Sequence, residues 1–395
     1  MNNGNKDNNS GLISDRANSI SPSGIRKFFD LLGSIEGVIS LGVGEPDYTT
    51  PWHIREAAIY SMERGYTMYT SNSGMPELRQ RLAMELKNRY KLEYDWQTEL
   101  LITVGVSEAL DLAMRAVINP GDEVIMTDPC YVAYDASVIL AGGVPVRVPT
   151  IEEKSFELEA EEVESRITDK TRAILLGYPS NPTGAVMPRE KLVKIAGVAR
   201  RHNILMIVDE IYSHLVYGME HTCMAALPGM QYNTILLSGF SKSYAMTGWR
   251  VGYAAASKDI IAAMTKIHQY TIMCAPTMGQ VAAIEALKSG QDDVAEMVED
   301  YNRRRLVMVN GLRKIGLSCF EPRGAFYAFP SIKSTGMKSD EFAEKLLMEE
   351  KVAVVPGTAF GKYGEGYIRC CYATSLKEIE EALQRMGRFV ERHRV

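Results

Sequence analysis

The sequence has few of the residues that form disulfides or bind metals, with six cysteines and six histidines among 395 residues. The cysteines are scattered apart from the adjacent pair Cys370 and Cys371, and no C-x-x-C spacing occurs. The histidines show no H-E-x-x-H spacing. We therefore expect neither a disulfide framework nor a protein-bound metal. Reduced thiols are typical of a cytosolic protein.

Long apolar runs and blocks of basic residues are also absent. No apolar run reaches the ~20 residues that a membrane-spanning helix needs, and the net charge at pH 7 is -5. Membranes and nucleic acids are therefore poor candidates for partners. The chain starts with the polar, Asn-rich segment MNNGNKDNNS, which has no apolar signal core. We expect a disordered tail over residues 1–20.

Apolar runs alternate with helical patterns through the first two thirds of the chain. This order predicts an α/β fold whose main sheet is mostly parallel. The chain is longer than one hydrophobic core usually holds, so a second, smaller domain is expected. We expect an N-terminal arm and part of the small domain over 21–48, a large domain over 49–290, and a small C-terminal domain over 291–395.

The segment 238–253, SGFSKSYAMTGWRVGY, follows the apolar run 234–237, which predicts a buried strand. It places Lys242 among small and hydroxyl residues and Arg250 between two glycines. Burial favours the neutral amine of a lysine, the form that attacks a carbonyl to make a Schiff base. An arginine offers a planar fork of donors to a phosphate. This pair suits pyridoxal 5'-phosphate (PLP), although Lys242 taken alone would favour an ordinary loop with two surface cations.

A glycine turn, Gly105-Val106-Ser107, joins an expected strand at 99–104 to an expected helix at 108–117. Free backbone N–H groups and the helix dipole favour an anion at such a position. The alternative is that Ser107 is simply the N-cap of the helix. Both interpretations can hold together.

Three polar residues follow or interrupt expected buried strands. Asn181 lies in an N-P-T-G turn after the strand 171–176, at the edge where α/β sheets bind ligands. Asp209 ends the apolar strand 204–208, where a carboxylate is costly unless paired. Arg369 interrupts the apolar strand 367–373 and needs an anion. The alternatives are that Asn181 is only a turn residue, that Asp209 is a helix cap, and that Arg369 forms a structural salt bridge.

Together with the G-E-P-D turn at 44–47 and the S-N-P-T-G segment at 180–184, the segment 238–253 resembles the class I/II aminotransferases of fold type I. The resemblance extends from about Gly24 to the C-terminus. It is strongest to the prokaryotic aspartate, alanine, aromatic and N-acetyl-diaminopimelate aminotransferases. It implies a PLP-binding large domain with a mostly parallel seven-stranded sheet, a smaller α+β domain, and a homodimer with shared active sites.

The resemblance also implies roles for individual residues. The catalytic residues would be Lys242, which binds PLP and moves the substrate proton, Asp209, which pairs with the pyridine nitrogen, and Tyr212, which bonds the cofactor's O3'. The implied cofactor-binding residues are Lys242, Gly105, Val106, Ser107, Tyr131, Asn181, Asp209, Tyr212, Ser241, Arg250 and the partner subunit's Tyr69. The implied substrate-binding residues are Gly44, Asn181 and Arg369. No metal site is implied.

Some positions leave alternatives open. Tyr131 matches the aromatic that stacks on the pyridine, with Tyr134 as the competing choice. Gly239 stands where the family often has serine, so either Ser238 or Ser241 could contact phosphate. Tyr327, in a G-A-F-Y segment, matches a residue at the pocket rim. The family tends to have a cis peptide bond at Asn181–Pro182.

Substrate preference is the least determined part of the prediction. Classical aspartate aminotransferases use a partner-subunit arginine for the side-chain carboxylate, and Tyr270 stands at its counterpart. No arginine occurs from 251 to 302, although Arg26 or Lys27 could substitute. We therefore favour alanine or an aromatic amino acid as donor, with 2-oxoglutarate as acceptor.

Three alternatives to that preference stay open. The first is an aspartate or N-acetyl-diaminopimelate aminotransferase. The second is a PLP-dependent C–S lyase, or another PLP lyase, on the same fold. The third is a PLP-binding regulator, which would need an appended DNA-binding domain, and residues 1–23 are too short for one.

Overall fold

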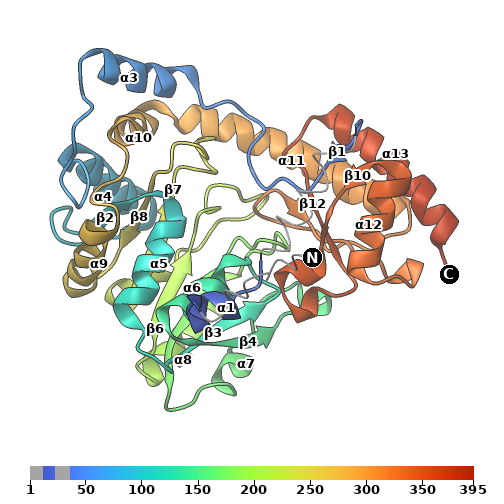
Figure 1. The fold of residues 1–395 in the computed structure, drawn as a ribbon, viewed down its shortest axis with the longest axis horizontal. Helices are drawn as coiled ribbons and strands as arrows, with labels where there is room; N and C mark the ends of the chain where they lie inside the picture. Colours follow the sequence, from blue (N-terminus) through green and yellow to red (C-terminus); the bar gives the residue numbers. More distant parts are fainter. Residues whose placement is uncertain (1–11, 23–35) are drawn as a thin grey trace, which may run out of the picture.

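A seven-stranded sheet forms the centre of the larger part of the molecule in the computed structural model, which describes residues 12–22 and 36–395 (Figure 1). The strand order is β2-β8-β7-β6-β5-β3-β4. All neighbours are parallel except β8, which runs antiparallel to both β2 and β7. The strands are β2 (Leu100–Thr103), β3 (Glu123–Asp128), β4 (Val144–Pro149), β5 (Thr171–Gly177), β6 (Leu205–Asp209), β7 (Thr234–Gly239) and β8 (Gly252–Ala255). The predicted α/β fold with a mostly parallel seven-stranded sheet is confirmed.

Helices cover both faces of this sheet, because successive residues of each strand are apolar and point to opposite sides. In β5, for example, Ile174 belongs to one core layer and Leu175 to the other. One layer includes side chains of α5, α6 and α9, and the other includes those of α3, α4, α7, α8 and α10. The bounds are α3 (Trp52–Glu63), α4 (Pro76–Tyr90), α5 (Gly105–Val117), α6 (Ala133–Ala141), α7 (Ala160–Glu164), α8 (Arg189–Arg201), α9 (Lys258–Thr271) and α10 (Thr277–Ser289).

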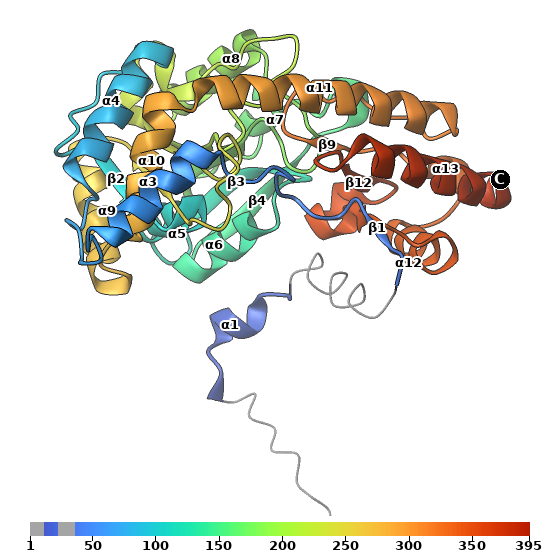
Figure 2. The ribbon, with the colours of Figure 1, turned by 90° about the horizontal axis from the view of Figure 1, so that it is seen from above.

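A smaller α+β layer follows the large one in the chain. The long helix α11 (Gln291–Lys314) extends from the large layer along the small one, where it packs beside α13 (Leu376–His393) (Figure 2). A three-stranded antiparallel sheet in the order β11-β12-β9 and a parallel pair β1-β10 share a third core with α11, α12 and α13. These elements are β1 (Ile39–Ser40), β9 (Tyr327–Ala328), α12 (Ser339–Glu350), β10 (Val352–Ala353), β11 (Val355–Pro356) and β12 (Ile368–Cys371). The exact domain boundaries stay a prediction.

Part of the N-terminal segment expected to be disordered is helical. α1 (Asp15–Ser19) is capped by the Ser14 hydroxyl, which accepts a hydrogen bond from the backbone N–H of Ala17 at 3.3 Å. The Arg16 side chain donates to the carbonyl of Leu140 at 3.4 Å, at the end of α6. The expectation of disorder over 1–20 is therefore wrong for this part. The expected arm helix starting at residues 23–29, with Arg26 and Lys27, lies outside the described residues.

Two further features of the described residues concern membranes and metals. Within residues 12–22 and 36–395, no helix has the length and apolar character needed to cross a bilayer. Over the same residues, no group of three or more His, Cys, Asp or Glu side chains is placed to hold a metal ion. All six cysteines are free thiols.

Candidate active site

A cavity of about 410 Å³ opens where β5, β6 and β7 end at their carboxyl edges. This edge is where open α/β sheets bind ligands. Most predicted site residues line the cavity: Gly44, Val106, Ser107, Tyr131, Asn181, Asp209, Tyr212, Ser241, Lys242, Arg250 and Arg369. Gly105 lies directly beside it, in the turn that Val106 and Ser107 continue. Of the predicted residues, Tyr69 lies elsewhere.

Sequence reasoning missed several residues that line the same cavity. They are Leu110, Ala133, Ser137, Pro179, Ile211 and Thr247. Thr247 could have been suspected, because it lies between Lys242 and Arg250 in the central segment. Leu110, Ala133 and Ser137 lie in the first two turns of α5 and α6, and Pro179 and Ile211 lie within two residues of a predicted residue. Their side chains carry no distinctive sequence signal.

Lys242 is partly buried in the turn that follows β7. Its Nζ donates a hydrogen bond to the backbone carbonyl of Gly44 at 2.7 Å. Burial is the main cause that lowers the pKa of this amine from 10.5 to about 8. A larger share of Lys242 is therefore neutral near pH 7 than for an exposed lysine, and the neutral amine is the nucleophilic form.

Asp209 ends β6 inside the cavity wall. Its Oδ2 accepts a hydrogen bond from the hydroxyl of Tyr134 at 3.0 Å, and its Oδ1 accepts one from the backbone N–H of Ile211 at 3.2 Å. Burial raises the pKa of this carboxyl from 3.8 to about 6, and the two hydrogen bonds act against that rise. The carboxylate is therefore available to a cationic partner at neutral pH.

The two competing tyrosines have different surroundings. The Tyr134 hydroxyl is bonded to Asp209, so its ring is held in the wall. The ring of Tyr131 lies edge-on to that of Tyr134, with centroids 5.6 Å apart, and also lines the cavity. Tyr131 thus remains the better candidate for a ring that stacks on a flat cofactor, and Tyr134 has the separate task of bonding Asp209.

The glycine turn differs from the expectation in one respect. Helix α5 begins at Gly105, three residues before the expected start, and Val104 is its N-cap. The interpretation of Ser107 as an N-cap is therefore wrong, because Ser107 lies in the first turn of the helix. The N–H groups of this turn have no acceptor within the helix, and they point toward a potential anion.

Arg250 and Ser241 complete this anion-binding region. A side chain at Gly105 would collide with the Arg250 guanidinium, so the glycine lets the arginine approach the turn. The Arg250 Nη1 also donates to the Thr247 carbonyl at 3.0 Å. Ser241 lines the cavity, whereas the hydroxyl of Ser238 donates to the Glu210 carbonyl at 3.1 Å. Of the two serines left open by the sequence, Ser241 is the one that faces the cavity.

The structure also gives a physical reason for the glycine at position 239. A Cβ there would lie 2.8 Å from the Cα of Gly252 and 2.9 Å from the Val251 carbonyl oxygen. Strands β7 and β8 approach each other too closely at this point for serine without a backbone shift. The close approach of β7 and β8 therefore accounts for glycine, and not serine, at position 239.

Arg369 is 2% exposed and lies on β12, in the small layer. Its Nη1 donates to Oδ1 of Asn181 at 2.8 Å, and its Nη2 donates to the Gly42 carbonyl at 2.7 Å. Its Nε has no hydrogen-bond partner in the described part of the chain. No carboxylate within residues 12–22 and 36–395 forms an ion pair with it, so the structural salt bridge is not observed. A buried cation without an anionic partner favours an anionic ligand.

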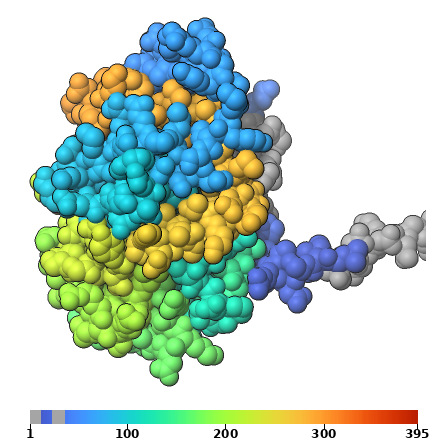
Figure 3. Space-filling view, turned by 90° about the vertical axis from the view of Figure 1, so that its left-hand side faces the viewer, coloured from blue at the N-terminus to red at the C-terminus, as the bar shows by residue number. Residues whose placement is uncertain are grey.

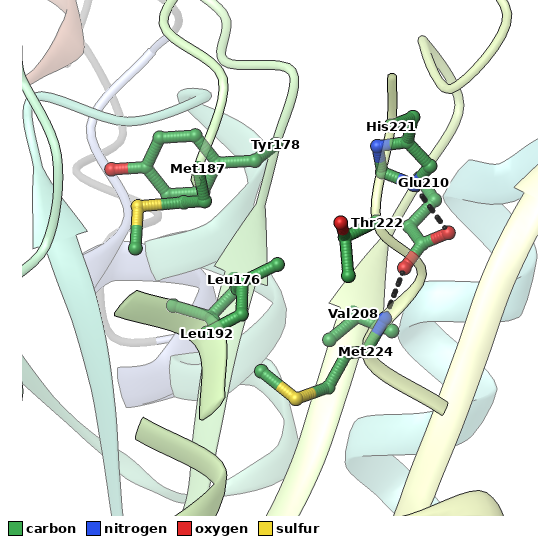
Figure 4. A pocket seen from close by; sticks show the side chains of 9 residues that line it. All are labelled: Leu176, Tyr178, Met187, Leu192, Val208, Glu210, His221, Thr222 and Met224. Carbon is green, nitrogen blue, oxygen red and sulfur yellow. Dashed lines mark hydrogen bonds and ion pairs between the residues drawn. The ribbon is translucent and has the colours of Figure 1, made fainter. Parts of the chain in front are cut away.

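A second, much smaller cavity of about 20 Å³ is lined in part by Val208 and Glu210, which flank Asp209 in the chain (Figure 4). In Figure 4, Glu210 and His221 point toward each other on one side, and Tyr178 and Met187 lie on the other. Glu210 Oε2 is 2.8 Å from Nε2 of His221, and its Oε1 accepts from the Met224 N–H at 3.1 Å. These groups are satisfied by one another, and the space is too small for an amino acid.

Tyr69 lies on an exposed loop of the large layer, and Tyr270 lies in the last turn of α9. They are 80% and 85% exposed, and neighbouring Met68 is 75% exposed. The hydroxyl of Thr277, the first residue of α10, donates to the Met68 carbonyl at 2.7 Å, which joins the Tyr69 loop to that helix. Figure 3 shows the corresponding face, on which the segments near residues 50–100 and 260–290 lie side by side. This exposed apolar surface is typical of a protein interface.

The cavity has the donor and acceptor groups that PLP requires. The first turn of α5, Ser241 and Arg250 fit a phosphate; Asp209 fits a protonated ring nitrogen; Lys242 fits an aldehyde carbon. Asn181 and Tyr212 offer hydrogen-bond donors for a phenolic oxygen. The bond between Asn181 and Pro182 is cis, as expected, and so are Asp128–Pro129 and Tyr178–Pro179. The residues present therefore fit the group.

Comparison with known proteins agrees with this chemistry. The family described as aminotransferase class I and II matches residues 36–386. A Bacillus subtilis (strain 168) protein named as an aminotransferase, YugH, is 57% identical over 96% of this chain and 98% of its own length. The aspartate aminotransferase of Pyrococcus abyssi (strain GE5 / Orsay) is 45% identical over 95% of this chain and 97% of its own.

A solved structure gives the same result in three dimensions. The aromatic aminotransferase from Pyrococcus horikoshii OT3 superposes with a TM-score of 0.89 at 43% identity, covering 93% of this chain and 99% of that one. The chain therefore belongs to the class I and II aminotransferases. It is a transferase of amino groups, and the predictions of fold type I and of this activity are confirmed.

Proposed function

We propose that this aminotransferase uses PLP to move the amino group of an L-amino acid, alanine or an aromatic one, to a 2-oxo acid such as 2-oxoglutarate. The observation that supports this most strongly is the cavity that contains both Lys242 and Arg369. Arg369 is a buried guanidinium without an anionic partner in the described chain, and Lys242 is an amine whose pKa is lowered by burial. The Arg369 guanidinium suits an α-carboxylate, and the Lys242 amine suits a carbonyl carbon.

When bound, PLP supplies an electron sink for the negative charge that develops at the substrate Cα. Lys242 would hold the cofactor, and its amine would move the proton away from Cα as general base and then as acid. Asp209 stabilises a positive charge on the ring nitrogen. Tyr212 and Asn181 hold the phenolic oxygen.

The substrate is oriented by its carboxylate. Arg369 offers a fork to the two oxygens, and its own position is fixed by Asn181 and the Gly42 carbonyl. Gly44 lies at the cavity wall, where the absence of a side chain lets the substrate approach its backbone. Two fixed ends, the phosphate at α5 and the carboxylate at Arg369, hold Cα in reach of Lys242.

We also propose a homodimer whose partner subunit's Tyr69 binds the phosphate. The exposed loop of Tyr69 supports this, because Met68, Tyr69 and Tyr270 are apolar or aromatic side chains left in water by a single chain. The free thiols of all six cysteines support a reducing compartment such as the cytosol.

The choice of substrate rests on which charged groups line the cavity. In the described chain these are Asp209, Lys242, Arg250 and Arg369, and each is already required by the cofactor or the α-carboxylate. No further cation there is left for a side-chain carboxylate, and Tyr131, Tyr134, Tyr212 and Tyr327 give the walls an aromatic character. The alternatives are an aspartate or an N-acetyl-diaminopimelate aminotransferase, for which Arg26 or Lys27 would have to bind the second carboxylate.

An absorbance spectrum of the purified protein with PLP tests the proposal. Single amino acids are added without any oxo acid, and the visible cofactor band is followed. Conversion to the pyridoxamine form with alanine or tyrosine supports the proposed donors. Conversion with aspartate alone contradicts them and favours the dicarboxylate alternative. A persisting band with release of pyruvate and ammonia identifies a PLP lyase, and no band after PLP addition contradicts PLP binding.

A further inference from the structure

Tyr327 lies between three of the site residues, although its sequence suggested only a place at the pocket rim. It is 1% exposed and belongs to β9. On the neighbouring strand its register partner is Cys371, two residues from Arg369 on β12. Residues two apart on a strand share a face. The Tyr327 ring therefore stacks on the Arg369 guanidinium, with 4.4 Å from the Cζ of Arg369 to the ring centroid.

The hydroxyl of Tyr327 has two oxygen neighbours. It is 2.7 Å from the hydroxyl of Tyr212 and 3.5 Å from the carbonyl oxygen of Gly44. The Gly44 carbonyl already accepts a hydrogen bond from Lys242 at 2.7 Å. A Cβ at position 44 would lie 2.7 Å from the Tyr327 hydroxyl, so this close approach requires the glycine.

Either hydroxyl can be the donor in the hydrogen bond between the two tyrosines. Burial raises the pKa of both Tyr212 and Tyr327, so both hydroxyls carry their proton at neutral pH. Tyr327 has two acceptors, the Tyr212 hydroxyl at 2.7 Å and the Gly44 carbonyl at 3.5 Å, and the shorter distance favours Tyr212. In the arrangement in which Tyr327 donates to Tyr212, the proton of Tyr212 is free to point into the cavity.

We propose that Tyr327 is a positioning residue for the amino-transfer reaction. Its hydroxyl donates to that of Tyr212 and so orients the proton of Tyr212 toward the phenolic oxygen of the cofactor, and its ring fixes the plane of Arg369 for the substrate carboxylate. The inference rests on the proposed use of PLP by this cavity. It assigns the hydroxyl and the ring separate effects, so two substitutions can separate them.

The test uses the PLP-loaded enzyme and the variants Tyr327→Phe, Tyr212→Phe and the double variant. A donor to the phenolic oxygen disfavours protonation of the cofactor's link to Lys242, so losing it raises the apparent pKa of the visible band. Tyr327→Phe should raise this spectroscopic pKa by about half a unit or more, the effect of one hydrogen bond. Tyr212→Phe should raise it further. The double variant should match Tyr212→Phe alone, because Tyr327 acts through Tyr212.

The ring is tested through substrate binding. Tyr327→Phe keeps the stacked ring and should leave the KM for the amino acid within about twofold, whereas Tyr327→Leu removes it and should raise KM by about fivefold or more. Tyr372→Phe is the control. Tyr372 is fully buried in the same layer and donates to the Ala325 carbonyl at 3.2 Å, outside the cavity. Tyr372→Phe should change neither the spectroscopic pKa nor the KM for the amino acid.

Three outcomes would overturn the inference: an unchanged spectroscopic pKa in Tyr327→Phe, additive shifts in the double variant, or a shift of the same size in Tyr372→Phe. Gly44→Ala provides a second route if Tyr327→Phe folds poorly, because its Cβ displaces the Tyr327 hydroxyl. The double variant Gly44→Ala/Tyr212→Phe should have the same spectroscopic pKa as Tyr212→Phe alone. Wild-type protein that shows no visible band with PLP would contradict the proposed function instead.

Discussion

The hydroxyl of Tyr134 donates a hydrogen bond to Oδ2 of Asp209 at 3.0 Å, from helix α6 to the end of strand β6. Position 177 on the neighbouring strand is glycine, and any side chain there would collide with this hydroxyl. The hydrogen bond stabilises the ionised carboxylate, while burial raises the pKa of Asp209 to about 6. Tyr134 therefore helps to keep Asp209 charged at neutral pH.

Tyr134→Phe should consequently make Asp209 easier to protonate. Hydrogen bonds to charged groups contribute about 1.5–3 kcal/mol, which corresponds to a shift of roughly one pKa unit or more. We expect the acid limb of kcat/KM to move upward by about one pH unit, and PLP to dissociate more readily at pH 6 than from the wild type. The measurements are a pH–rate profile and a titration of the cofactor-free protein with PLP.

Tyr178→Phe is a suitable control for that variant. Tyr178 is also buried, and its hydroxyl donates to the Phe156 carbonyl at 2.8 Å, away from Asp209. Both substitutions remove one buried hydrogen bond, but only Tyr134→Phe should move the acid limb. Equal pH profiles for the two variants would show that Tyr134 has only a structural role.

Asp209 should destabilise the cofactor-free protein in a pH-dependent way. Its pKa is raised from 3.8 to about 6, so the folded state binds this proton more tightly than the unfolded state. The contribution to stability is complete below pH 3.8 and is lost as pH rises through about 6. A shift of this size corresponds to about 3 kcal/mol. At pH 7 the ionised carboxylate is the unfavourable form.

Asp209→Asn removes this titration. The free energy of unfolding of the cofactor-free variant, minus that of the wild type, should increase by about 3 kcal/mol between pH 4 and pH 7. Urea unfolding of both proteins at equal concentrations measures it. The same variant should lose amino transfer at neutral pH. Asp259→Asn, at an exposed position, is the control. The argument is refuted if the difference in free energy of unfolding between Asp209→Asn and the wild type does not change with pH.

Arg369→Lys should separate substrate binding from cofactor binding. Lysine keeps the charge but loses the planar fork. We expect kcat/KM for the amino acid and for the oxo acid to fall by about 10–100-fold, the effect of a hydrogen bond to a charged group. The visible PLP band should persist. Arg305→Lys, a buried arginine paired with Glu321 at 3.0 Å, controls for general effects in the same layer. Loss of the band in Arg369→Lys would contradict its assignment to the substrate.

The residues that the sequence could predict were those whose chemistry conflicts with their surroundings. Asp209 ends an apolar strand, Arg369 interrupts another, and Lys242 lies in a tight turn among small residues. Such groups are costly to bury unless a ligand or partner compensates for them. The structure brings these three to one cavity. Parallel strands end at a common edge, so this meeting followed from the predicted fold.

The residues that the sequence could not settle depend on contacts between distant segments. Nothing local distinguishes Tyr134 as the partner of Asp209, or Tyr327 as the neighbour of Tyr212, because 75 and 115 residues separate the members of these pairs. The start of α5 was predicted three residues late, because the glycine turn resembled a linker preceding a capped helix.

The proposed sharing of active sites gives the last prediction. If the partner subunit's Tyr69 binds the phosphate, each site needs Lys242 from one chain and Tyr69 from the other. Lys242→Ala alone should lower amino transfer by at least ~10²–10⁴-fold, since the proton-transfer group is lost. Tyr69→Ala should weaken PLP binding. A heterodimer of these two variants contains one intact site, and it should recover about half of the wild-type activity per dimer.

The matched control places both substitutions in one chain. A heterodimer of wild type with Lys242→Ala/Tyr69→Ala contains the same four side chains in total, but Lys242 and Tyr69 of the wild-type chain then serve different sites. It should be nearly inactive at limiting PLP. Heterodimers isolated with two different affinity tags allow both measurements. If Tyr69 acts within its own subunit, the order reverses: the control is half active and the first heterodimer is not.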